Sequence, residues 1–317
     1  MECRICQNDK KNKSYKVREM MYGFKDEFEY FQCSDCDCLQ ILNYPKNMDK
    51  YYSDNYYSKI QKNNGIKKII LNLRDKYSFY RKGLLGKILN EKFPNLALES
   101  LSFLDKKPNS KELKIVDIGC GAGNLLFTLR EFGFENTLGV DPFISKEINY
   151  ENGLKIVKGE LSETKDKWDI VMFHHSFEHI PFQIKTLKNA KNLLTENGLC
   201  LIRIPVVSSY AWENYGVNWV QLDAPRHFYL HSIKSMEVLA KQCGMRLGKV
   251  EFDSETLQFW GSEQYLKDIP LNAKESYANG VKNSIFSSKE ISEFAKRAKD
   301  LNKNQRGDQA NFFLYKQ

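Results

Sequence analysis

The sequence has no long apolar run, either inside the chain or at its start. No stretch of about 18 apolar residues, the length that crosses a bilayer, occurs in its 317 residues. The opening MECRICQNDKKNK lacks the apolar region of a secretion signal, so we expect a cytoplasmic protein without a membrane span. Hydrophobic residues at 42% and charged residues at 28% are values usual for soluble proteins.

Histidine is scarce as well. The chain has five, and His174, His175 and His179 all stand in the segment HHSFEHI beside Glu178. A metal site would need side chains that converge from one element. This segment spans an expected strand end and a helix start, where the four-residue spacing of His175 and His179 does not ensure a common face. We therefore expect no metal ion here.

Eight cysteines in a chain without a secretion signal are expected to be reduced thiols. Two Cys-x2-Cys pairs, Cys3 with Cys6 and Cys33 with Cys36, can close tetrahedrally around one ion, because each pair places two sulfurs on a tight turn. A four-cysteine site leaves no open coordination position. We therefore predict a structural Zn²⁺ in a small module of two knuckles joined by short strands, with Cys38 as a spare thiol.

Positive charge is concentrated in the first third of the chain. Residues 1–112 contain 22 basic and 15 acidic side chains, whereas the rest of the chain contains 26 and 25. This distribution suits an anionic partner, such as a nucleotide-linked substrate or RNA. It is also typical of a solvated face rich in lysine.

From residue 113 onward, short apolar runs alternate with amphipathic stretches. This pattern predicts an α/β fold with a mostly parallel, Rossmann-like sheet covered by helices on both faces. Helices are expected over 124–133 and, with a glycine stop, over 182–198. The last two strands favour an antiparallel final hairpin. The seven expected strands cover residues 113–119, 136–143, 154–160, 168–175, 199–206, 246–254 and 309–316.

The polar break at residues 105–112 precedes this change of pattern and marks a predicted domain boundary. A further segment at about 262–308 is polar and helix-prone, and we assign it only as a cover or a dimer contact. The predicted division is a zinc-binding module at 1–60, a helical linker or cover at 61–112, and a Rossmann-like domain at 113–317 with insertions at about 206–232 and about 262–308.

A glycine-rich loop follows the first expected strand of the sheet. Gly119 and Gly121 let the backbone approach a ligand closely, with a helix N-terminus behind them. The dinucleotide fingerprint requires glycine at the position of Asn124, so NAD is not favoured. Asp117 precedes the loop, and Asp141 closes the second strand, where a carboxylate can accept hydrogen bonds from both ribose hydroxyls.

The stretches VDIGCGAG, GVDPF, and EHI followed by LLTENGLCLIRIP resemble motifs of the class I S-adenosylmethionine-dependent methyltransferases, over about residues 113–260. The resemblance implies that the chain binds S-adenosyl-L-methionine. It places His174 or His175 in the methyl-donor pocket and makes His179 a helix-start residue bonded to its neighbours. The other residues that it implies are Asp117, Gly119 and Gly121 around the methionine portion and the loop, Asp141 at the ribose, and Pro142, Phe143, Glu160 and Leu161 near the adenine.

The insertion at about 206–232 contains RHFYLHS, which resembles EHFSYFS in the zinc-containing sugar C-methyltransferases. The histidine before phenylalanine is their catalytic base, so the resemblance implies this role for His227, with His175 as a second acid–base candidate. Arg226 replaces their glutamate. We expect Arg226 and Tyr229 to contact the acceptor, and Arg226 to bind a phosphate or carboxylate group of it. The tyrosine-rich segment 51–59 also resembles theirs, which places Tyr57 over the cofactor.

Together these features predict O-methylation of a nucleotide- or lipid-linked sugar in surface polysaccharide biosynthesis. An imidazole of near-neutral pKa suits removal of the hydroxyl proton. The alternatives are C-methylation of a keto-deoxysugar nucleotide, methylation of RNA held by the basic first third, and a non-catalytic cofactor-binding protein. The even charge of the catalytic half argues against nucleic acid, and His227 with Arg226 argues against a protein without catalysis.

Overall fold

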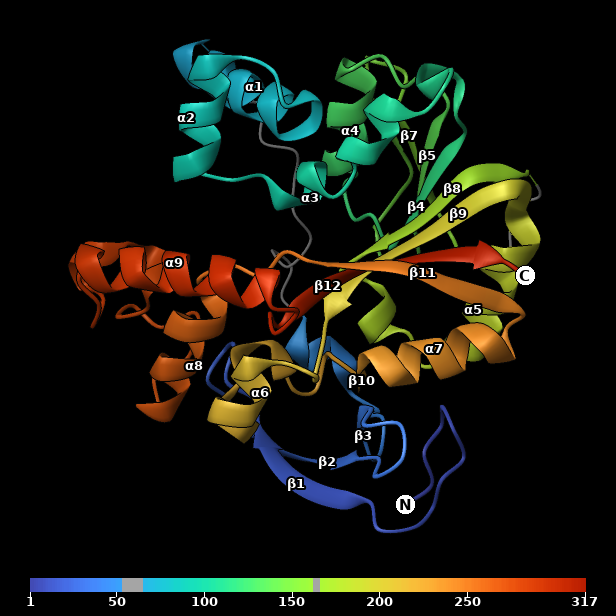
Figure 1. Cartoon of the computed structure of the whole chain (residues 1–317). Coiled ribbons are helices and arrows are strands. Elements are labelled where there is room, and N and C mark those ends of the chain that lie inside the picture. The colour runs from blue at the N-terminus through green and yellow to red at the C-terminus, as the bar shows by residue number, and fades with distance from the viewer. Residues whose placement is uncertain (53–64, 162–165) are drawn as a thin grey trace. The chain divides into compact units, whose positions relative to one another are not determined.

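The computed structural model describes residues 1–52, 65–161 and 166–317, which form two compact units (Figure 1). Strand β9 (Leu194–Pro205) supplies residues to both. No helix in the described part of the chain is long and apolar enough to cross a membrane. We call Asn55–His174 with Leu193–Cys200 the glycine-loop unit, and Met1–Asp54 with His175–Asn192 and Leu201–Gln317 the cysteine-cluster unit.

The glycine-loop unit is built on a mostly parallel sheet. Five of its strands lie in the order β8 (Trp168–His174), β4 (Ile115–Ile118), β5 (Thr137–Asp141), β7 (Lys155–Lys158) and β6 (Ile148–Asn149). β4 pairs in parallel with β5 and β8, and β5 with β7, whereas the added edge strand β6 is antiparallel. All four residues of β4 are buried, which is typical of a central parallel strand.

The predicted helical segment before this sheet is present as α1 (Gly65–Tyr80), α2 (Leu84–Lys92) and α3 (Leu96–Glu99). Helix α4 (Asn124–Glu131) follows the first strand, as predicted. Phe79 of α1 packs against Phe132 and Phe134, with ring centroids 5.5 and 5.6 Å apart. This aromatic cluster joins α1 to the turn after α4.

The cysteine-cluster unit contains an antiparallel sheet of four strands, in the order β1 (Lys13–Arg18), β2 (Glu27–Gln32), β3 (Leu39–Ile41) and β10 (Tyr229–Leu230). β1 and β2 are the short strands predicted between the two cysteine pairs. β10 comes from the insertion at about 206–232, and its Tyr229 lies opposite Gln40 of β3. The sequence contains no signal for this pairing, because two-residue strands have no periodicity to read.

The same unit also holds the predicted C-terminal hairpin. β11 (Met245–Phe252) pairs antiparallel with β12 (Gln309–Lys316), and β12 lies next to β9. Its helices are α5 (Gln183–Leu193, of which Leu193 belongs to the other unit), α6 (Tyr210–Tyr215), α7 (Ile233–Gln242), α8 (Leu257–Leu266) and α9 (Ser288–Lys303). Helix α9 lies in the segment that the sequence marked as helix-prone.

Two local predictions were wrong. The helix expected over 182–198 ends at Leu193, and β9 begins at once, with Thr195 Oγ1 donating to Asp169 Oδ1 at 3.0 Å. His179 does not open α5; it ends a separate 3₁₀ turn, Phe177–His179. Ile180 is extended because it precedes Pro181, and a residue before proline is disfavoured in the helical region.

Candidate functional site

The glycine loop joins β4 to α4 and forms one candidate site, in the glycine-loop unit. Gly119, Gly121 and Gly123 have φ values of 73°, 55° and 77°, a region that side chains with a Cβ rarely adopt. A Cβ on Gly123 would also overlap the side chain of Ile156. The loop therefore requires glycine for both its conformation and its packing.

Two carboxyl groups lie at this loop. Asp141 Oδ2 accepts from Gly121 N and Oδ1 from Phe143 N, each at 2.8 Å. Asp117 is 3% exposed, and its Oδ1 has no hydrogen-bond partner among the described residues. Burial, with a contribution from Asp141, raises the pKa of Asp117 well above its usual value. A buried carboxyl oxygen without a protein donor beside a glycine loop fits a bound polar ligand.

The other predicted cofactor residues follow the carboxyl ends of the strands, where ligands bind in open α/β sheets. Phe143 is 68% exposed and follows β5, as does the exposed Pro142. Glu160 and Leu161 follow β7, the first exposed and the second buried. His174 ends β8. Tyr57 lies outside the described residues.

The four predicted zinc ligands come together in the cysteine-cluster unit. Sγ of Cys3 lies 3.6 Å from that of Cys36, Sγ of Cys6 lies 3.4 Å from that of Cys33, and all four sulfurs are within 4.8 Å of one another. Zn–S bonds of about 2.3 Å in a tetrahedron would place the sulfurs about 3.8 Å apart. The cluster therefore fits a structural Zn²⁺, and Cys38 lies outside it.

A third cluster, also in the cysteine-cluster unit, combines Glu178, His179, His227 and Asp223; we call it the imidazole cluster. His227 Nε2 lies 3.9 Å from Glu178 Oε1 and 3.7 Å from Asp223 Oδ2. The rings of His179 and His227 meet edge to face, with centroids 4.7 Å apart. The cluster brings residues of the HHSFEHI segment to the predicted base.

Main-chain carbonyl groups set the tautomer of both imidazoles. His179 Nδ1 lies 2.9 Å from Arg226 O, and His227 Nδ1 lies 2.8 Å from Gln221 O. A carbonyl oxygen only accepts hydrogen bonds, so each Nδ1 carries the proton and each Nε2 presents a lone pair when the ring is neutral. His227 Nε2 can therefore accept a proton.

The carboxylate of Glu178 is fully buried, and neither oxygen has a hydrogen-bond partner of good geometry among the described residues. Burial would raise its pKa, but the interactions with His175, His179 and His227 lower the pKa to about 2. Burial, and then His227, lower the pKa of His179 to about 4. At neutral pH the cluster thus contains a charged Glu178 and a neutral His179.

The possible metal-ligating atoms of Glu178, His179 and His227 also lie within 4.8 Å of one another, a spacing that could hold a metal ion. Metal binding at Nε2 of His227 and proton transfer at the same atom exclude each other. Elemental analysis of the purified protein separates the two cases.

His175 lies at the edge of this cluster, next to Glu178. Its backbone has the strained φ of 51°, and Arg203 Nη1 donates to its Nε2 at 2.6 Å. The proton of the neutral ring is therefore on Nδ1, 3.4 Å from Glu178 Oε1. Arg203 is held in turn by Asp253 at 2.7 Å. This arrangement holds the ring of His175 beside Glu178.

The N-terminal sheet holds His227 in place through main-chain contacts. Tyr30 Oη donates to His227 O at 2.8 Å, and Ile41 N donates to Phe228 O at 3.0 Å. Phe228 N donates to Glu178 O at 2.9 Å. The module that carries the four cysteines therefore supports the predicted base.

Arg226 lies where it cannot contact an acceptor. Its side chain is fully buried and bonds Asp223, Glu19 Oε1 at 3.2 Å and Tyr51 O at 3.0 Å. The predicted contact with a substrate phosphate or carboxylate is therefore corrected: Arg226 instead orients Asp223. Tyr229 is 2% exposed, and its hydroxyl bonds Pro181 O and Tyr44 Oη at 3.0 and 2.8 Å.

Sequence reasoning missed Asp223 and the meeting of Glu178 with His227. Asp223 stands four residues before His227 in LDAPRH, a spacing that could have drawn attention to it. Nothing in the sequence links Glu178 to His227, because their proximity depends on the hydrogen bond from Phe228 to Glu178.

The fold and the glycine-loop site define an α/β domain that binds a nucleoside-containing cofactor. The family model described as "Methyltransferase domain" matches residues 89–250, just over half of the 317 residues, and the chain belongs to this family. The domain is a class I S-adenosylmethionine-dependent methyltransferase domain.

Two curated relatives, both named ubiquinone biosynthesis O-methyltransferase, are similar to the chain. The one from Pelagibacter ubique is 24% identical over 44% of this chain and 65% of its own length. The one from Azorhizobium caulinodans is 27% identical over 37% of this chain and 50% of its own length. Thus the chain spans less than two thirds of each. A solved S-adenosylmethionine-dependent methyltransferase from Archaeoglobus fulgidus is 19% identical over 73% of this chain and 99% of its own, with a TM-score of 0.43.

Proposed function

We propose that the chain methylates a hydroxyl group of a nucleotide- or lipid-linked sugar in surface polysaccharide biosynthesis, with His227 as general base. The observation that carries the proposal is the hydrogen bond between His227 Nδ1 and Gln221 O, which leaves Nε2 to accept a proton. A sugar hydroxyl has a pKa far above neutral, so its methylation gains from such a base.

When bound, S-adenosylmethionine supplies an electrophilic methyl group on sulfur. Nε2 of His227 would accept the hydroxyl proton as the acceptor oxygen takes the methyl group from the cofactor sulfur. Glu178 and Asp223, 3.9 and 3.7 Å from Nε2, stabilise the imidazolium that results. On the cofactor side, we propose that Asp141 accepts from the ribose hydroxyls and that Asp117 contacts the methionine portion.

The names of the two curated relatives state O-methyl transfer, which supports oxygen as the atom methylated. C-methylation of a keto-sugar is a second candidate with an observation in its favour. The replacement of an acidic neighbour of the base by Arg226 favours oxygen slightly, but Glu178 and Asp223 supply two carboxylates beside His227. The cluster is therefore also suited to removing a carbon-bound proton beside a carbonyl.

The test of the acceptor is a panel of sugar nucleotides and lipid-linked sugars incubated with labelled S-adenosylmethionine. NMR of the product then locates the new methyl group on oxygen or carbon. Transfer to RNA and to none of the sugars would refute the proposal.

The test of the base is His227→Ala. We expect kcat to fall by about 100-fold or more, with partial rescue by added imidazole and unchanged affinity for S-adenosylhomocysteine. His179→Gln serves as the comparison, because it removes the neighbouring imidazole and leaves Nε2 of His227 present. Near-normal turnover of His227→Ala would show that another group removes the proton.

A further inference from the structure

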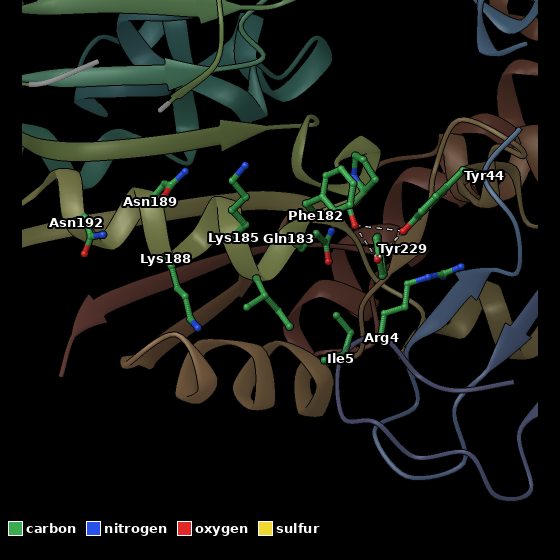
Figure 2. A pocket seen from close by; sticks show the side chains of 12 residues that line it. Arg4, Ile5, Tyr44, Phe182, Gln183, Lys185, Lys188, Asn189, Asn192 and Tyr229 are labelled. Carbon is green, nitrogen blue, oxygen red and sulfur yellow. Dashed lines mark hydrogen bonds between the residues drawn. The ribbon is translucent and has the colours of Figure 1, made fainter. Parts of the chain in front are cut away.

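A cleft of about 750 Å³ lies within the cysteine-cluster unit, lined by α5 along most of its length, by the residues just before it, by Tyr229 and by parts of the N-terminal module (Figure 2). At one end, the hydroxyl groups of Tyr44 and Tyr229 meet at 2.8 Å, and both lie within hydrogen-bond distance of Pro181 O. This volume is in the range of sites that hold a small molecule the size of a nucleotide.

The charge of the cleft has one sign. Arg4, Lys185 and Lys188 line it, and no acidic residue does so in the described part of the chain. None of the three forms an ion pair with another described residue. The cleft therefore holds three cationic side chains without an ion pair among the described residues.

Arg4 is fixed before any ligand arrives. Its Nη1 and Nη2 donate to Ile41 O and Leu42 O at 2.7 and 2.6 Å, and its guanidinium lies 4.8 Å from the ring centre of Tyr44. Carbonyl groups orient the guanidinium without cancelling its charge. A cation held in this way costs little further ordering when an anion binds.

Helix α5 adds to the positive potential. Gln183, Ile184 and Lys185, its first three residues, line the cleft, and its first turn contains no acidic residue. The first N–H groups of a helix lack partners within the helix and attract anions. In Figure 2, Lys185 and Lys188 extend from α5 in opposite directions, and Asn189 lies on the side of Lys185.

Phe182 contributes a flat apolar surface at the same cleft, since its side chain is 70% exposed. An exposed ring close to cations and amide groups suits a planar base joined to phosphates. We propose that this cleft binds the diphosphate and base of a nucleoside diphosphate, the carrier of the sugar acceptor. This inference rests on the proposed function and names the carrier as a nucleotide instead of a lipid.

The test uses calorimetry on the full-length, metal-loaded protein with uridine diphosphate, inorganic pyrophosphate and farnesyl diphosphate. The double variant Lys185→Ala/Lys188→Ala should weaken uridine diphosphate and pyrophosphate about tenfold or more, because each charged contact contributes to affinity. The control Lys241→Ala/Lys296→Ala removes the same charge at exposed positions outside the cleft and should change neither affinity more than about twofold. Phe182→Ala should weaken uridine diphosphate only.

Equal losses in the control and the test variant would overturn the proposal, since they would indicate unspecific charge attraction. Tighter binding of farnesyl diphosphate than of uridine diphosphate would assign the diphosphate to a lipid carrier and would also overturn it. So would a single-stranded RNA oligomer that binds more tightly than uridine diphosphate and loses affinity in the double variant. Binding is measured without turnover, so absence of sugar methylation with intact uridine diphosphate binding would refute the proposed function alone.

Discussion

The glycine loop and the imidazole cluster are assembled in opposite ways. The loop is one short segment, and Asp141, which anchors Gly121 N, lies 20 residues further along the chain at the end of the neighbouring strand. In the imidazole cluster, Glu178 and His227 come from distant segments. Phe228 N donates to Glu178 O, and the N-terminal sheet donates to His227 O and Phe228 O. The first site depends on local structure, whereas the second depends on the cysteine module.

The largest expected effect comes from Cys36→Ser. Structural zinc contributes on the order of 10 kcal/mol to folding in small modules, and β3 of this module pairs with β10 next to His227. We expect loss of the metal and a fall in turnover of about 100-fold or more. S-adenosylhomocysteine affinity should change little, because the four cysteines lie outside the glycine-loop unit.

Elemental analysis and calorimetry measure both effects. Cys243→Ser, a buried thiol outside the cluster, is the control and should retain its metal. Metal content that is unchanged in Cys36→Ser would contradict the four-cysteine site. A second equivalent of metal that is lost only in Glu178→Gln would place an ion in the imidazole cluster and would exclude His227 as the base.

Asp141→Ala tests the glycine loop and should give the opposite pattern to Cys36→Ser, with cofactor affinity lost and metal retained. The change removes the acceptor of two backbone N–H groups and the proposed ribose contact, and hydrogen bonds to a charged group contribute about 1.5–3 kcal/mol each. We expect S-adenosylhomocysteine affinity to fall about 10- to 100-fold with metal content unchanged. The exposed Asp166→Ala is the control, and equal affinities in both variants would argue against the loop as the cofactor site.

Glu178→Gln should act on turnover alone. The substitution keeps the volume and removes the charge 3.9 Å from His227 Nε2, so the imidazolium loses stabilisation. We expect kcat to decrease about 10- to 100-fold, with S-adenosylhomocysteine affinity unchanged in calorimetry. Glu237→Gln makes the same chemical change at an exposed position of α7 and should leave kcat unaltered. A normal kcat in Glu178→Gln would remove Glu178 from the mechanism.

Gly123→Ala should have the smallest effect. Alanine at a φ of 77° costs about 1–2 kcal/mol, and its Cβ would in addition press on Ile156. Gly133→Ala is the control. Its φ is 88°, so alanine there has similar backbone strain, but the atom nearest to its new Cβ is Lys111 Cδ at 4.0 Å. The difference between their free energies of unfolding in urea measures the contact with Ile156. Equal values would mean that the Ile156 side chain moves aside freely.

Much of the framework could be predicted from sequence because its signals are local. Five of the seven strands, all but β7 and β11, are largely buried apolar runs, the cysteine pairs are close in sequence, and the glycine loop lies directly between a strand and a helix. The 182–198 helix was predicted too long because its glycine stop at Gly198 lies inside β9, where tertiary pairing overrides the local preference.

Arg226 illustrates what local signals cannot provide. An arginine next to a predicted base suggests an anion contact, yet this guanidinium is buried against Asp223, Glu19 and Tyr51. Its partner Glu19 is 207 residues away in the chain. No pattern of spacing in the sequence could have paired them, because ion pairs between distant segments depend on which elements pack together.

The sequence by itself determined the order of strands along the chain, the glycine loop with its two acids, and the cysteine pairs, since each depends on neighbours in the chain. Tertiary structure decided the partners of His227: a glutamate from another segment, an aspartate oriented by a buried arginine, and a strand of the N-terminal module. The physical reason is that pKa values and proton transfer depend on distances of a few ångströms in space, and these distances exist only once the segments have packed.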